Sequence, residues 1–559
     1  MGFLKEKNQK TINSVVTSWL AEYYIYVLVI LAIVLPLFLH QGYVFFVDFH
    51  FGPHVPVDFF SSGFLMGAVV NIFSLFYFYS FGEKLFIAAV LFLVLLGGKK
   101  IAESLSDNKW IIFITSLFFL FNPFVYGRMM YGQIGVLAAF GLLCLALGYG
   151  LSYVKDRKNI DLYRWGIFTG LSLQFSSHFI FFSFILYGVL FSILLWRKID
   201  KKQFLKVISV ILLCIIILNT NWILGYIKKP SQLDFNQNFN IKDLVAFQTS
   251  GKTGSESLGN VLMMSGFWGK ERGIYADLTG VGQPWGISFL LLSPIIFFGL
   301  FIGFKKKEFR PMTLGLISIF IIAVVLAIGI RLPISREITY WLFNHVPFYK
   351  GLRESAKWVS LIVIIYGIWL TFGLNSLLKY RIVKENRALS VILVSLLIVM
   401  QAPFLLFGFK NQVHPVNYPQ DWQQIDEYII SHQDANSSSD CKDLILFLPW
   451  HLYMSFSWIG NLVVNPANSF FSCPVIQGTN MEWAGIYDNS GDKNGMIIKE
   501  WLEKKNEPDS LINQGLNIKY IILAKEVDWQ EYQWLDKIDE LKLVKETDTL
   551  KLYELDKNE

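Results

Sequence analysis

The sequence predicts an α-helical polytopic membrane protein with about eleven transmembrane helices and a small C-terminal extracytoplasmic α/β domain. Three observations lead to this fold class. The 559-residue chain is 54% hydrophobic and only 16% charged, with a mean hydropathy of +0.45, which is too apolar for a soluble globular protein. Long apolar runs recur through residues 1–409, whereas residues 410–559 alternate short strand-like and helix-like segments.

The apolar runs define the membrane core. The N-terminus carries Lys5, Lys7 and Lys10 but no small-residue cleavage site after the first run, so we expect that helix to be retained. Runs suited to cross about 30 Å of hydrocarbon lie near residues 22–40, 84–99, 110–127, 133–153, 164–178, 179–196, 206–225, 284–304, 311–330, 355–378 and 388–409.

One further apolar run, residues 59–81, decides the topology. If the N-terminus is cytoplasmic and this run does not cross, the inner loops are rich in Lys and Arg, and Arg128 is the only basic residue of the short outer loops. The positive-inside rule requires such a distribution. We therefore expect residues 59–81 to form interfacial helices in a multi-pass protein of the cell membrane. The net charge of +6 then reflects topology, and nucleic acid is not implied.

The C-terminal domain is predicted from alternating periodicity. Its two cysteines, Cys441 and Cys473, could form a disulfide or remain as two free thiols. We expect strands at 444–448, 520–524, 541–544 and 550–553 and helices near 494–504 and 528–538.

The first outer loop, residues 41–58, holds the leading candidates for chemistry. It contains Asp48, His50, His54 and Asp58 and no basic residue. Asp48 lies between aromatic residues, where a carboxylate is costly unless it is paired or functional. Asp58 precedes an apolar helical run and could instead cap it.

Basic residues gather at two other outward positions. Arg128 ends the third span and suits phosphate, although an interface anchor fits equally. His178, in a later outer turn, is more typical of a structural residue. Lys350, Arg353 and Lys357 precede the tenth span, where a helix N-terminus also favours anions; pairing with Glu354 or attraction to lipid headgroups are the alternatives.

Three motifs carry a family resemblance: an Asp soon after the first helix, the run Asn122-Pro-Phe-x-Tyr-x-Arg128 followed by Gly132-Gln133, and Phe348-Tyr-Lys-Gly-Leu-Arg-Glu354 before a later helix. Over about residues 20–410 the chain resembles the GT-C glycosyltransferases, in the branch of the large arabinofuranosyltransferases and related multispanning membrane proteins. No Walker, GxGxxG, HExxH or GxSxG motif supports ATP-driven or hydrolytic chemistry.

The resemblance implies transfer of a sugar from a polyprenyl-phosphate donor in the membrane lipid to an extracytoplasmic glycan, lipid or protein acceptor. It implies that Asp48 is the catalytic base and that Arg128 and Arg353 bind phosphate. The sequence fixes no metal and leaves a divalent cation open. The remaining substrate-binding candidates are Asp58, His50, His54, Gln133, His178, Lys350 and Lys357.

A noncatalytic envelope-assembly factor or a lipid or polysaccharide transporter is the alternative function. Transporters tend to contain paired discontinuous helices and internal repeats, and the sequence displays neither pattern. A lateral groove beside Asp48 would favour transfer, whereas a polar cavity through the whole core would favour transport.

Overall fold

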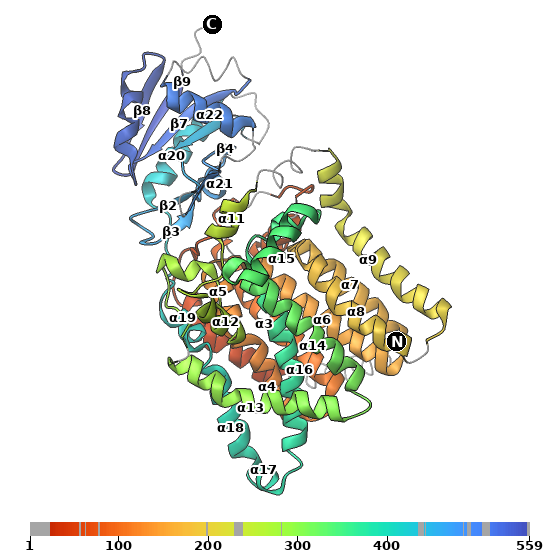
Figure 1. Cartoon of the computed structure of the whole chain (residues 1–559). Coiled ribbons are helices and arrows are strands. Elements are labelled where there is room, and N and C mark those ends of the chain that lie inside the picture. Colours follow the sequence, from red (N-terminus) through yellow and green to blue (C-terminus); the bar gives the residue numbers. More distant parts are fainter. Residues whose placement is uncertain are drawn as a thin grey trace, which may run out of the picture.

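The computed structural model consists of a helical body with a mixed α/β domain at one end (Figure 1). Helix α17, in the hairpin between α16 and α18, marks the opposite end of the body. The structure describes residues 23–54, 57–61, 63–75, 79–196, 199–228, 239–280, 282–433, 441, 443–483, 486–488, 493–505 and 515–555.

Helices make up the body. The first described helix is Tyr23–Phe38. It is followed by α2 (Phe64–Ser74), α3 (Tyr79–Leu105), α4 (Lys109–Leu120), α5 (Pro123–Met130), α6 (Ile134–Asp156), α7 (Asn159–Phe175), α8 (Phe179–Trp196), α9 (Lys201–Lys228), α11 (Ile241–Ala246), α12 (Gly254–Leu262), α13 (Pro284–Lys305), α14 (Arg310–Ile328), α15 (Pro333–His345), α16 (Val359–Leu377), α17 (Arg381–Glu385), α18 (Arg387–Val399) and α19 (Leu406–Lys410).

The predicted helical membrane fold is confirmed, with shorter elements than expected at some spans. Within the described residues, seven helices are long and apolar enough to cross a membrane, and two bent pairs raise this number to nine. The other two predicted runs form the 16-residue helix Tyr23–Phe38 and the 17-residue α7. In one bent pair, Pro123 begins α5 after a 43° bend. Arg128 therefore lies in a helix and not in the expected hairpin.

The segment 59–81 does not form a span of its own. Its described part contains α2, whose 11 residues extend over about 16 Å at the usual helical rise, well short of about 30 Å of hydrocarbon. The next helix, α3, begins at Tyr79 and continues for 27 residues. Phe64–Ser74 is thus a short helix before a long one, as the loop charges predict.

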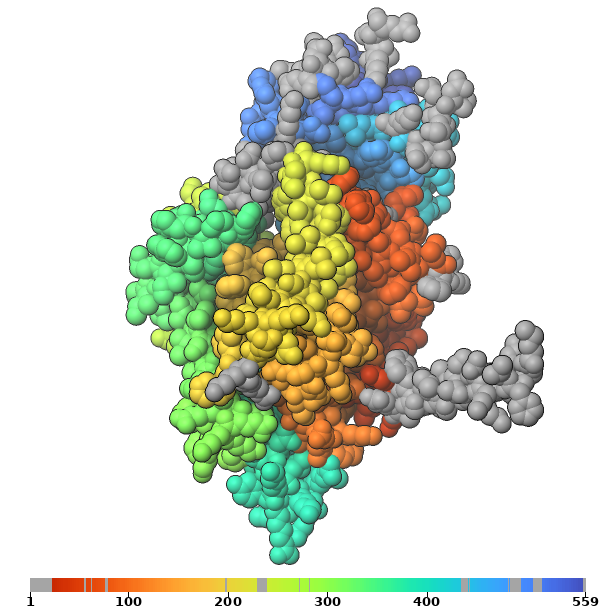
Figure 2. All heavy atoms as spheres, turned by 90° about the vertical axis from the view of Figure 1, so that its right-hand side faces the viewer, coloured from red at the N-terminus to blue at the C-terminus, as the bar shows by residue number. Residues whose placement is uncertain are grey.

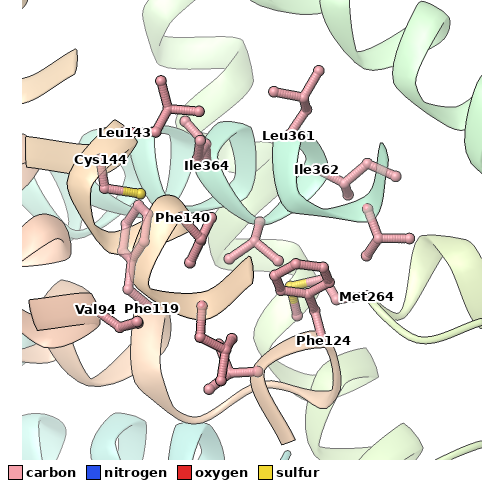
Figure 3. Packing of buried hydrophobic residues seen from close by; sticks show 14 of the residues in the cluster. Val94, Phe119, Phe124, Phe140, Leu143, Cys144, Met264, Leu361, Ile362 and Ile364 are labelled. Carbon is pink, nitrogen blue, oxygen red and sulfur yellow. The ribbon is translucent and has the colours of Figure 1, made fainter. Parts of the chain in front are cut away.

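The centre of the body is a hydrophobic cluster formed by α3, α4, α5, α6 and α16 (Figure 3). The side chains of Phe119, Phe140 and Ile364 are fully buried there. Gly299 allows α13 and α16 to pack closely, because a Cβ at this position would lie only 1.7 Å from the carbonyl oxygen of Trp369 in α16. At the periphery α9 crosses the outside of the body (Figure 2), and its exposed Leu and Ile side chains suit contact with lipid.

The C-terminal domain is built on a five-stranded mixed sheet. Strand β1 pairs in parallel with β4 and β7, and β9 pairs antiparallel with β7 and β8, in the order β4-β1-β7-β9-β8. The four predicted strands are confirmed. The elements are α20 (Gln420–Ser431), β1 (Leu444–Leu448), β2 (Tyr453–Ser455), β3 (Leu462–Val464), α21 (Ala467–Phe470), β4 (Val475–Ile476), β5 (Met481–Trp483), β6 (Ile486–Asp488), α22 (Lys493–Lys504), β7 (Ile518–Ala524), β8 (Leu541–Glu546) and β9 (Leu550–Leu555).

Two further features of this domain bear on the sequence predictions. Cys441 and Cys473 form a disulfide, which resolves the two alternatives that their positions left open. Residues Trp529–Lys537 form a 3-10 helix close to the predicted 528–538. The hairpin of β2 and β3 projects from the domain toward the helical body (Figure 1).

The loop of residues 41–58, called the first loop below, joins the domain to the body. The backbones of Tyr43 and Val416 exchange two hydrogen bonds of 2.8 Å, and the amide of Val464 donates to the carbonyl of Val47 at 2.8 Å. On the body side, the fully buried Glu83 of α3 accepts hydrogen bonds from the amides of Val44 (2.8 Å) and Phe51 (3.2 Å). The loop is therefore fixed from both sides.

Candidate functional site

Asp48 lies where the domain, the first loop and the helical body meet. The hydroxyl of Tyr453, in β2, donates a hydrogen bond of 2.7 Å to Oδ1 of Asp48. The amide of Asp48 donates to the carbonyl of Tyr131 at 3.0 Å. The backbone bond fixes the position of the carboxylate at the body, and the hydroxyl fixes its orientation from the domain.

Burial raises the pKa of Asp48 above its ordinary value. The hydroxyl of Tyr453 and the guanidinium of Arg272 act in the opposite direction, whereas the nearby carboxylate of Glu354 adds to the rise. The net result is a carboxyl group that takes up a proton more readily than an exposed aspartate. Once ionised, such a group is a stronger general base than an exposed aspartate.

An ion-pair network lies behind Asp48 in the body. The side chain of Arg128 is only 1% exposed and donates to Glu354 at 2.7 Å, and Lys357 lies 3.4 Å from the same carboxylate. The indole of Trp268 also donates to Glu354, at 3.1 Å. Burial alone would raise the pKa of Glu354, but Lys357 and Arg128 hold that pKa well below its usual range.

This network includes residues that the sequence singles out. Arg128 also donates to Gln133, and the amide of Gln133 lies 3.3 Å from Glu354. Arg353 is the chain neighbour of Glu354, but its guanidinium lies against the ring of Phe239, 3.7 Å from the centroid. The structure thus brings Asp48, Arg128, Gln133 and Lys357 into one region with Glu354.

The long loop before α13 contributes a further cation. The guanidinium of Arg272 lies 4.9 Å from the ring centroid of Trp268 and 5.4 Å from that of Tyr453. Its positive charge counters the rise in the pKa of Asp48. Sequence reasoning missed Arg272, Trp268 and Tyr453. The pair of cations at Lys270 and Arg272 in an outward loop was the available signal.

A pocket of about 450 Å³ opens beside Asp48 between the first loop and the C-terminal domain. Asp48, Phe49, His50 and Phe51 form one wall, and α2 contributes Met66. The opposite wall comes from the domain and includes Leu452, Val464, Asn465, Asn468, Ser469, Gln477, Thr479 and Asn494. Neither the predicted phosphate ligands Arg128 and Arg353 nor Lys350 and Lys357 line this pocket.

The other candidates of the first loop lie on the domain side. His50 lines the pocket, and its Nε2 lies 3.4 Å from the hydroxyl of Ser469; burial lowers the pKa of His50 to about 4, which keeps it neutral. His54 contacts the hydroxyl of Ser472 at 3.0 Å. Asp58 is exposed and accepts from the amide of Phe60 at 2.9 Å, a local turn contact away from the pocket.

Of the last two candidates, His178 lies near the ion-pair network. His178 is in the turn between α7 and α8, and burial together with Lys357 lowers its pKa to about 3. Lys350 lies 5.6 Å from the ring centroid of Phe343. In the described part of the chain, no three His, Cys, Asp or Glu side chains are grouped to hold a metal ion, so we assign no ligand set to the divalent cation that the sequence leaves open.

His451, two residues before Tyr453, contacts the carboxylates of Glu482 and Asp528, and these three residues are called the histidine clamp below. Nδ1 of His451 lies 3.0 Å from Glu482, and Nε2 lies 3.1 Å from Asp528. Although burial lowers the pKa of His451, its hydrogen bonds to Asp528 and Glu482 raise it overall. The clamp fixes the backbone two residues before Tyr453.

The comparisons with known proteins agree with this architecture. A family model described as "Domain of unknown function (DUF6311)" matches residues 67–350, about half of the chain. The chain belongs to this family. The DUF6311 region extends from α2 to the segment just before Glu354 and thus contains Arg128 and Gln133 but not Asp48. No curated protein matches the chain.

The solved structures show the fold of this DUF6311 protein. The arabinofuranosyltransferase AftD from Mycobacteria is 14% identical with a TM-score of 0.59, and its R1389S mutant is 12% identical with a TM-score of 0.54. Both alignments cover 97% of this chain, which spans about two-fifths of the AftD chain. ArnT from Cupriavidus metallidurans matches at 11% identity and TM-score 0.41, over 96% of this chain and 98% of that one. The protein has the GT-C fold and is a multi-pass membrane protein.

Proposed function

We propose that the protein is a membrane glycosyltransferase that moves a sugar from a polyprenyl-phosphate donor to an extracytoplasmic acceptor. The observation that carries the proposal is the position of Asp48, which lies in the wall of a pocket and is held by Tyr453 from the domain. The GT-C fold shared with AftD supports the class of reaction. In this proposal residues 1–409 hold the donor, and residues 410–559 complete the site on the extracytoplasmic side.

The chemistry requires a base, a place for phosphate and access for a lipid. The acceptor hydroxyl gives its proton to Asp48 while its oxygen forms a bond to the anomeric carbon of the donor sugar. The bond between that carbon and the phosphate oxygen breaks, and polyprenyl phosphate leaves with the electron pair. Burial, which raises the pKa of Asp48, makes the carboxylate a stronger base for the first of these events.

Cations near Asp48 suit the negative charge on the departing phosphate. Arg272 is the cation that approaches Asp48 from the long loop. Arg128 and Lys357 both pair with Glu354. In the proposal these two cations and Arg353 outnumber the carboxylate of Glu354, and the excess positive charge attracts the phosphate. In the proposal the polyprenyl chain lies along the exposed apolar side chains of the body helices.

Replacing Asp48 tests the proposal directly. Asp48→Asn keeps the shape of the side chain and can accept the hydroxyl of Tyr453, but it removes the base. Loss of general-base assistance typically costs about 10²–10⁴-fold in rate, so transfer from a polyprenyl-phosphate sugar by the protein in lipid nanodiscs should fall by that factor. Asp58→Asn, in the same loop but exposed, is the matched control and should retain most activity. Unchanged transfer by Asp48→Asn would reject Asp48 as the base.

A further inference from the structure

The pocket beside Asp48 has a lining that indicates what it binds. We propose that this pocket is the acceptor site and that it takes an uncharged, hydroxyl-rich glycan, which the C-terminal domain selects through Asn468, Thr479 and Asn494. The inference rests on the proposed sugar transfer and adds the chemical class of the acceptor and a role for the domain. Three properties of the lining carry it: its charge, its frame and its rim.

The charge of the lining excludes the common anionic acceptors. Asp48 and His50 are the two titratable residues among the described residues that line the pocket, and no Lys or Arg is among them. His50 stays neutral because burial lowers its pKa to about 4. A uronate or phosphate bound in this pocket would meet the carboxylate of Asp48, and no Lys or Arg of the lining would pair with it, whereas an uncharged hydroxyl would find in Asp48 an acceptor for its proton.

Two buried amides give the pocket a fixed frame. Gln477 accepts from the amide of Asn468 at 3.1 Å and donates to the carbonyl of Asn465 at 2.8 Å. The side chain of Asn465 in turn accepts from the amide of Ala467 at 3.1 Å. These hydrogen bonds hold the turn that begins α21 against β4, and they prepare the polar wall before a ligand arrives.

The rim of the pocket offers exposed polar side chains from three separate elements. Asn468 lies in α21, Thr479 follows β4, and Asn494 is in the first turn of α22. Amide and hydroxyl groups can both donate and accept hydrogen bonds, which matches the hydroxyl groups of a sugar. Leu452 and Val464 add apolar surface between these groups, which suits the C–H faces of a sugar ring.

A peptide acceptor fits this pocket less well. Peptides commonly bind by adding a strand to the edge of a sheet, where main-chain hydrogen bonds supply affinity. The sheet edge that lines the pocket is β4, which has only two residues, Val475 and Ile476. So short an edge offers few main-chain partners, whereas the side-chain amides around it are numerous.

Binding without turnover tests the proposal. The full-length wild-type protein in lipid nanodiscs, without a sugar donor so that no transfer occurs, is titrated with three probes: uncharged arabino- and manno-oligosaccharides, oligogalacturonides, and a set of unglycosylated peptides. Saturation-transfer NMR reports binding. We expect the uncharged oligosaccharides to bind. Asn468→Ala and Asn494→Ala, on different elements, should each weaken binding by about twofold to tenfold, the worth of one hydrogen bond. Asn417→Ala, exposed in the same domain but outside the pocket, is the matched control.

The outcomes separate this inference from the proposed function. Preferred binding of oligogalacturonides or peptides, no binding of uncharged oligosaccharides, or binding that neither pocket variant weakens would overturn it. If uncharged oligosaccharides bind through the pocket but the wild-type protein transfers no sugar, the pocket stands and the transferase proposal fails. If the wild-type protein instead transfers a sugar to a uronate or peptide acceptor, the transferase proposal stands and the inference about the acceptor fails.

Discussion

The hydrogen bond from Tyr453 to Asp48 makes the C-terminal domain part of the site, and Tyr453→Phe removes that bond alone. The hydroxyl lies 2.7 Å from Oδ1 of Asp48, and a hydrogen bond to a charged group contributes about 1.5–3 kcal/mol. It stabilises the ionised carboxylate, so its loss favours the protonated form. Since about 1.4 kcal/mol corresponds to a factor of ten, the proton affinity of Asp48 should rise at least about tenfold in the variant.

The sign of the effect follows from the role of the base. Transfer requires ionised Asp48, so the rate falls as the pH drops through the pKa of that group. Tyr453→Phe should move this acidic limb of the pH–rate profile upward by about one pH unit or more, with a small change on the alkaline plateau. Tyr553→Phe is the matched control, because it removes a 2.6 Å hydrogen bond to Asp536 elsewhere in the domain. A uniform loss of rate with an unmoved limb would refute the reasoning.

Two other predictions concern stability and topology. Glu354→Gln leaves the buried Arg128 and Lys357 without the carboxylate that pairs with both and should destabilise the protein by about 3–5 kcal/mol. Arg128→Gln should destabilise it less, because Glu354 still pairs with Lys357. Thermal unfolding in nanodiscs measures both, and a larger loss of stability in Arg128→Gln would contradict the prediction. Reporter fusions at Lys155 and Glu559 should report cytoplasmic and extracytoplasmic locations respectively, in keeping with the disulfide of the domain. A cytoplasmic signal from the C-terminus would reject that orientation.

Much of the fold could be predicted because bilayers and sheets impose regular patterns. Spans need long apolar runs, and the runs at 133–153 and 284–304 became α6 and α13 with small changes at their ends. Period-two alternation predicted β1 and β9 in the same way. Prediction was less accurate where a run is interrupted. Asn122 accepts a hydrogen bond of 3.0 Å from the amide of Val125 and so caps α5, and the predicted single span at 110–127 is therefore two helices with a bend between them.

The partners of a charged group are harder to predict than its position. Glu83 was not among the predicted site residues, and its partners are backbone amides, those of Val44 and Phe51, which lie 39 and 32 residues earlier in the chain. Arg128 was expected to bind phosphate, but the carboxylate that it meets, Glu354, lies 226 residues away in the sequence. Residue types alone do not predict such a pair, because only the packing of the helices brings the two groups together.

The separation between Asp48 and Tyr453, 405 residues, has a consequence for how the site is assembled. The first loop does not orient Asp48 by itself, because Glu83 and Tyr131 fix its backbone, whereas the carboxylate is held by Tyr453 of the domain and Gln133 of the body. The domain in turn holds Tyr453 through the histidine clamp at His451. Since the same domain supplies the opposite wall of the pocket, any movement of the domain changes the acceptor wall and the orientation of the base together. Base strength and acceptor fit are therefore coupled in this architecture.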